Sequence, residues 1–77
     1  MSEDSELDSL QVAYKDAVDT WIAAIQEERS LVAVTPHSIA DVDKWEHAHF
    51  TEEGARNLAK KAKEIYEEAL RSRFFGF

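Results

Sequence analysis

The chain has 77 residues, a formal net charge of −7 and no cysteine, and these properties exclude several classes of protein. Its length allows one domain with a small hydrophobic core, near the lower size limit for independent stability. Disulfide bonds and thiolate metal sites are excluded. Stability therefore has to come from helix packing, self-association or a metal held by oxygen and nitrogen ligands.

Acidic and basic residues are unevenly distributed along the chain. Residues 1–55 carry thirteen acidic and three basic side chains, whereas residues 56–77 carry three acidic and six basic ones. Nucleic acid is not expected as a partner, because binding to it relies on basic side chains that neutralise phosphates. The basic C-terminal part is instead expected to lie against acidic helices, within one chain or between chains.

No segment has the pattern of a targeting signal or a membrane span. Residues 1–8 are acidic and lack the basic and apolar regions of a signal peptide. No apolar run approaches the roughly 20 residues that cross a bilayer. The expected location is the cytoplasm, with no membrane partner.

A long first helix is predicted over residues 5–34, with Ser5 as its N-cap and Pro36 beyond its end. Spacings of three and four alternate along it, as in a coiled-coil seam, through Leu7, Leu10, Tyr14, Ala17, Trp21, Ala24, Glu28 and Leu31. A second stripe widens the apolar face and consists of Val18, Ile22, Ile25 and Val32, with Arg29 inserted.

Two further helices are predicted after the proline. Ser38 with Asp41 three residues later predicts a helix start, and a short helix is expected over residues 39–47. Thr51 and the two acids after it predict a second start, and a long helix is expected over residues 52–72. Its apolar face consists of Ala55, Leu58, Ala59, Ala62, Ile65, Tyr66, Ala69 and Leu70.

These elements predict one all-α domain over residues 1–77: an antiparallel hairpin of two long helices with a short helix in the connection. Each long helix has a broader apolar face than one neighbour can cover, which favours a homodimer packed as a four-helix bundle. The alternative is a three-helix monomer in which the short helix covers that face. The predicted interface residues are Trp21, Ile22, Ile25, Trp45, Tyr66, Phe74, Phe75 and Phe77.

The last three of these residues belong to an apolar tail, residues 73–77. Three phenylalanines are too apolar for a solvated chain end, so we expect them to pack on their own bundle or on a second subunit. The alternative is that they anchor a different, unidentified protein.

The densest group of candidate metal ligands lies near the predicted break between the second and third helices. Glu46 and His49 have the Glu-x-x-His spacing that di-iron bundles use, Glu53 follows, and Glu28 is the polar member of the first seam. The alternative is that the histidine and the carboxylates are solvated or pair with basic residues. The pattern is too short to assign a metal or any cofactor.

No catalytic motif is present: the sequence has neither a nucleophile elbow nor a glycine-rich phosphate loop. The leading hypothesis is therefore a non-enzymatic, self-associating helical protein that serves as an interaction or regulatory module. A metal-binding helical bundle is the alternative. A third hypothesis is an acidic protein that binds a basic protein surface.

Overall fold

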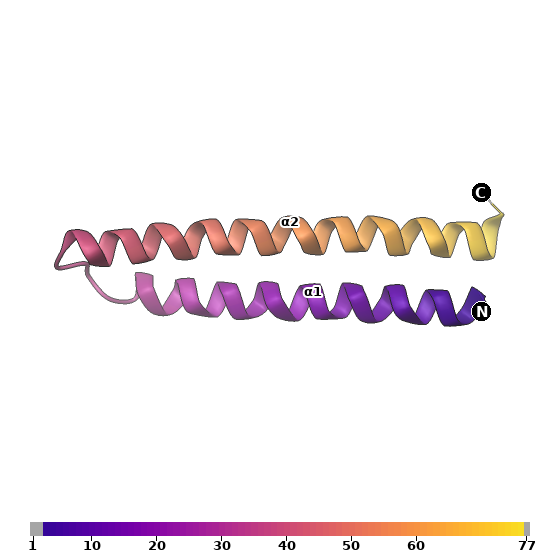
Figure 1. Ribbon diagram of the computed structural model, residues 1–77, viewed down its shortest axis with the longest axis horizontal. Coiled ribbons are helices and arrows are strands. Elements are labelled where there is room, and N and C mark those ends of the chain that lie inside the picture. The colour runs from indigo at the N-terminus through magenta and orange to yellow at the C-terminus, as the bar shows by residue number, and fades with distance from the viewer. Residues whose placement is uncertain (1–2, 77) are drawn as a thin grey trace.

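A computed structural model describes residues 3–76 of the chain as a hairpin of two helices. Helix α1 spans Glu3–Val32 and helix α2 spans Ile39–Phe75. The helices run antiparallel along their whole length, so both chain ends lie at the same end of the molecule (Figure 1). The molecule is a rod that measures 56 × 18 × 16 Å. The prediction of an all-α hairpin is confirmed.

Helix α1 begins and ends two residues earlier than predicted. After Val32, the amide of Ala33 donates to the Arg29 carbonyl at 3.1 Å and the amide of Val34 donates to the Leu31 carbonyl at 3.3 Å. The second of these bonds tightens the last turn, and Pro36 prevents the helix from continuing.

The start of α2 agrees with the predicted cap. The Ser38 hydroxyl accepts a hydrogen bond from the Asp41 amide at 3.2 Å, while the Asp41 carboxylate accepts one from the His37 amide at 3.1 Å. These bonds satisfy two amides that have no acceptor within the helix. At the other end, Gly76 adopts a left-handed conformation with φ 73°, which terminates the helix.

The prediction of a separate short helix is wrong, because α2 continues without a break through residues 47–52. The Thr51 hydroxyl does not cap a new helix but donates to the His47 carbonyl at 3.0 Å. Gly54 costs only roughly 1 kcal/mol in a helix interior relative to alanine. Ala48 and Ala55 are buried on either side of this segment, and this packing against α1 holds the helix together. The tail is also helical as far as Phe75.

The two helices meet along a line of buried and half-buried residues, here called the inner seam. From α1 it contains Leu7, Leu10, Tyr14, Ala17, Trp21, Ala24, Glu28 and Leu31, as predicted. From α2 it contains Ala48, Glu52, Ala55, Ala59, Ala62, Tyr66 and Ala69. The rings of Tyr14 and Tyr66 lie 6.2 Å apart and mark the register of the two helices.

Two residues that were predicted to belong to the buried face of α2, Leu58 and Ile65, are exposed. The unbroken helix explains the difference. Spacings of four and three that start at Ala48 place Ala55 and Ala59 in the seam, and this phase turns Leu58 away from α1. Over residues 3–76, neither helix is both long enough and apolar enough to span a membrane.

Candidate interaction surface

The buried part of the inner seam is made entirely of alanine. Ala24, Ala48, Ala55 and Ala59 are the buried hydrophobic residues, and no large side chain among residues 5–76 is fully buried. Small side chains allow two helices to approach closely, but each removes little apolar area from water. The hairpin therefore has little hydrophobic core of its own.

The exposed area of the chain leads to the same conclusion. A compact monomer of 8.8 kDa exposes about 4,800 Å², so the 6069 Å² of this chain is roughly 1,300 Å² in excess. Much of that surface is apolar, because large aliphatic and aromatic side chains on both helices are exposed. Monomeric proteins rarely leave large contiguous apolar patches in water.

A row of exposed and half-buried aliphatic side chains lies on α1. It is here called the outer ridge and consists of Val18, Ile22, Ile25 and Val32. Ile22 is 46% exposed, Ile25 is 41% exposed and Val32 is 56% exposed, while Val18 is half-buried. Two of the predicted interface residues, Ile22 and Ile25, thus lie on an open surface of the hairpin.

Lys15 lies one turn before the outer ridge and forms a charged rim with Asp19. The Lys15 ammonium donates to Asp19 Oδ2 at 2.8 Å, and both side chains are exposed. This hydrogen bond, with the negative charge of Asp19, raises the pKa of Lys15 above its ordinary value. Lys15 is therefore positively charged at neutral pH beside the apolar row.

The other predicted interface residues before the tail lie in different surroundings. Trp21 and Tyr66 are half-buried in the inner seam, where Tyr66 contacts Tyr14. The indole Nε1 of Trp21 is buried and has no hydrogen-bond partner. Trp45 is exposed and lines a hollow next to the helix connection together with Pro36. Trp21 and Tyr66 are therefore occupied largely by contacts within the hairpin.

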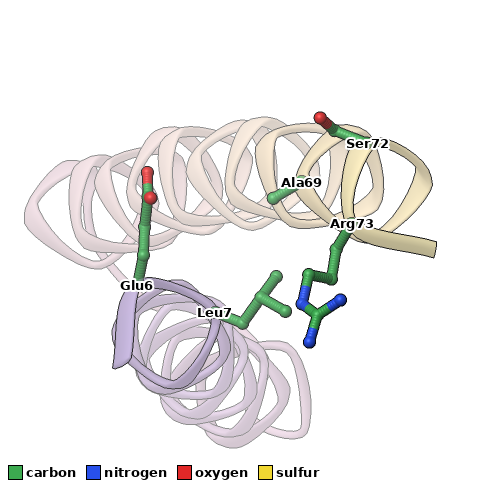
Figure 2. A pocket seen from close by; sticks show the side chains of 5 residues that line it. All are labelled: Glu6, Leu7, Ala69, Ser72 and Arg73. Atoms are coloured by element: carbon green, nitrogen blue, oxygen red, sulfur yellow. The ribbon is translucent and has the colours of Figure 1, made fainter. Parts of the chain in front are cut away.

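Phe74 and Phe75, the phenylalanines of the tail that the structure describes, do not fold back onto the hairpin as one prediction had it. Phe74 and Phe75 continue the last turn of α2 and are 67% and 71% exposed. The Arg73 guanidinium lies 5.6 Å from the centre of the Phe74 ring. Figure 2 shows Arg73 and Leu7 directed into the hollow between the free ends of the helices. Phe77 lies outside the described residues.

Two of the four candidate metal ligands lie next to each other in the fold. His49 Nδ1 lies 3.7 Å from Glu28 Oε1, across the two helices. Glu46 and Glu53 lie on the same face of α2 as His49, at spacings of three and four residues. Within the described part of the chain, no three acidic or histidine side chains are grouped closely enough to hold a metal ion.

The sequence interpretation missed a polar pair next to this contact. The side chain of Glu52 is 14% exposed, and its Oε2 lies 3.8 Å from Arg56 Nε without forming a hydrogen bond. By the register of the tyrosine pair, Glu52 and Glu28 occupy the same level of the inner seam. Glu52 follows Ala48 by four residues and precedes Ala55 by three. In one continuous helix over residues 39–75, this spacing places Glu52 in the inner seam with the two alanines.

Glu28 and Glu52 form a polar layer in an otherwise apolar seam. This layer costs stability, but it disfavours other alignments of the two helices, because those would bury the carboxylates against alanine. With the inner seam thus occupied, the surface that remains for binding is the apolar side chains outside it. Comparison with protein-family models, curated proteins and solved structures finds no match to this chain.

Proposed function

We propose that this protein is a non-enzymatic helical module that acts by self-association, with a homodimer as its working unit. The observation that supports this function is the combination of a seam buried only through alanines with an exposed row of large aliphatic side chains. A stable protein interface buries about 800 Å² per partner. The excess area of the hairpin is larger than that, so a second copy would complete a core that one chain lacks.

In this proposal the dimer is a four-helix bundle in the cytoplasm, and nucleic acid is not a partner. The apolar residues left outside the bundle, among them Phe74 at its end, would be available to a further protein partner. The dimer would then serve as a scaffold or regulatory subunit whose binding competence depends on its concentration.

Thermal unfolding at several protein concentrations tests this function. If two chains fold and associate together, the melting temperature followed by far-UV circular dichroism rises steadily between about 1 and about 100 μM chain. A melting temperature that is the same at all concentrations would contradict self-association coupled to folding.

A metal-binding bundle is the second candidate function, and the contact between Glu28 and His49 favours it. Glu46 and Glu53 would add ligands from the same face of α2. The test is metal analysis of protein purified without a histidine tag, with His49→Ala as the variant and His47→Ala as the matched control, because His47 lies on the other side of α2. Metal that is bound by the control and lost in His49→Ala would support this function, and metal-free native protein would contradict it.

A further inference from the structure

The outer ridge has the periodicity of a second coiled-coil seam on the same helix. Val18, Ile22, Ile25, Arg29 and Val32 follow one another at spacings of four, three, four and three residues. The inner seam of α1 has the same spacings on an adjacent face. A helix with two adjacent seams is typical of a four-helix bundle, in which each helix contacts two neighbours.

Three members of the outer ridge are arranged symmetrically in the sequence. Val18 and Val32 lie seven residues on either side of Ile25. A second copy of this helix, turned end for end about Ile25, would therefore place Val18 opposite the partner's Val32 and Ile25 opposite the partner's Ile25, while Ile22 would lie at the level of the partner's Glu28. A surface that matches itself in this way is what a twofold dimer requires.

The alignment of the two helices shows on which side of the hairpin the outer ridge lies. Ile25 and Val32 each come one residue after an inner-seam residue, and His49, Glu53 and Arg56 do the same on α2. Two antiparallel helices are related by an approximate twofold axis that is perpendicular to the plane containing both helix axes. Residues that come one position after the inner seam on either helix therefore lie on the same side of the hairpin. The contact of His49 with Glu28, a neighbour of the ridge, agrees with this placement. Ile65 lines a hollow with Glu6 and Leu10 and belongs to the opposite side.

The register of the tyrosine pair places Ala55 at the level of Ile25. The same rotation would bring Glu53 to within one residue of the level of the partner's Arg56, a pair of opposite charges. The charges on α2 are therefore compatible with a centre at Ile25.

The opposite side of the hairpin has fewer large apolar side chains. Its exposed ones are Leu58 and Ile65 on α2, and the α1 residues there are small or charged, such as Ala13, Asp16 and Thr20. Less apolar area would be removed from water on that side. A dimer formed through the outer ridge is therefore favoured over one formed through the opposite side, and variants on the two sides distinguish them.

We infer that two copies of the chain associate through the outer ridge, with α1 packed antiparallel against the partner's α1 about a twofold axis at Ile25. This inference rests on the proposed self-association and adds its face, its orientation and its centre. The Val18 side chain would contact the partner's Val32, and the charged side chains of α2 would form the rim of the interface.

Single cysteines test the geometry cleanly, because the chain has no cysteine of its own. Under mild oxidation, Ile25→Cys is expected to form a disulfide-linked dimer, whereas Leu58→Cys stays monomeric on a non-reducing gel. A mixture of Val18→Cys and Val32→Cys should cross-link more efficiently than either variant alone, because only an antiparallel pairing brings those two positions together. Cross-linking of Leu58→Cys but not of Ile25→Cys would overturn the inference, and so would equal cross-linking of both.

A second pair of variants measures the energetic role of the ridge. Ile25→Asp is expected to raise the dimer dissociation constant by roughly a hundredfold or more, because two charges would be buried against apolar side chains at the centre. Leu58→Asp should change it by less than about tenfold. Circular dichroism at high concentration checks that both variants are helical. If the wild-type chain is a monomer, the proposed function fails, whereas a wild-type dimer that is insensitive to Ile25→Asp overturns only the assignment of the ridge.

Discussion

The inner seam and the outer ridge lie side by side on α1 but meet very different surroundings. In the inner seam, bulky residues such as Trp21 and Leu31 face alanines of α2, so the helices lie close together while the large side chains stay half-buried. On the outer ridge, Ile22 and Ile25 face solvent. Close helix contact and hydrophobic burial are therefore separate properties of this fold. The hairpin achieves the first within one chain, and in the proposed dimer a second copy would provide the other.

The largest effect is expected where the close approach is broken. Ala59 is 2% exposed, and Ala59→Leu would push α2 away from α1 and cost about 1–3 kcal/mol of unfolding free energy. Ala23→Leu is the matched control, because Ala23 is exposed on α1, and its effect should stay within about 0.5 kcal/mol. Chemical denaturation at one fixed protein concentration compares the two. Equal effects would mean that the alanine seam is not closely packed.

The tyrosine contact offers a smaller and more specific test of the inner seam. Rings 6.2 Å apart in a tilted arrangement should be coupled by about 0.5–1.5 kcal/mol. A double-mutant cycle with Tyr14→Leu and Tyr66→Leu measures this coupling from unfolding free energies. Additive effects of the two substitutions would show that the rings do not meet and that the register is different.

Ser38 and Thr51 both resemble helix N-caps in the sequence, but their substitutions should have different effects on the unfolding free energy. Ser38→Ala removes the side chain that accepts from the Asp41 amide and should cost about 1 kcal/mol. Thr51→Ala should be neutral or stabilising by a few tenths of a kcal/mol, because alanine is the better residue in a helix interior. A loss with Thr51→Ala that equals the loss with Ser38→Ala would restore the predicted break in α2.

The smallest expected effect is a gain in stability at Gly54. An added Cβ there meets no atom within 4 Å, so Gly54→Ala should raise the unfolding free energy by about 0.5–1 kcal/mol. Thermal unfolding measures this as an increase in melting temperature. A decrease would indicate that Gly54 needs a conformation outside the α-helix.

Sequence alone predicted the parts of this fold that local rules determine. The heptad spacing of α1, the capping by Ser38 and the turn at Pro36 follow from periodicity and from the chemistry of single residues. The continuity of α2 was not predictable from Thr51 and Gly54, whose local preferences favour a break. Packing of Ala48 and Ala55 against α1 decides that segment, and this packing is a property of the folded hairpin.

The candidate interaction surface was also predictable from the sequence only in part. The exposed position of Ile22 and Ile25 follows from the phase of the α1 seam, which the sequence predicted. The phase of α2 depends on its continuity, and this is why Leu58 was placed on the buried face and Glu52 was overlooked. The contact between Glu28 and His49 requires the register of two distant segments, for which the sequence contained no local signal.

Sedimentation equilibrium of the wild-type chain at micromolar concentration distinguishes a self-associating chain from a monomer. We expect a species with twice the 8.8 kDa mass of one chain, in exchange with the monomer as the concentration falls. A single species of 8.8 kDa across the whole concentration range would contradict it. The outer ridge would then be a surface that one chain leaves open to water.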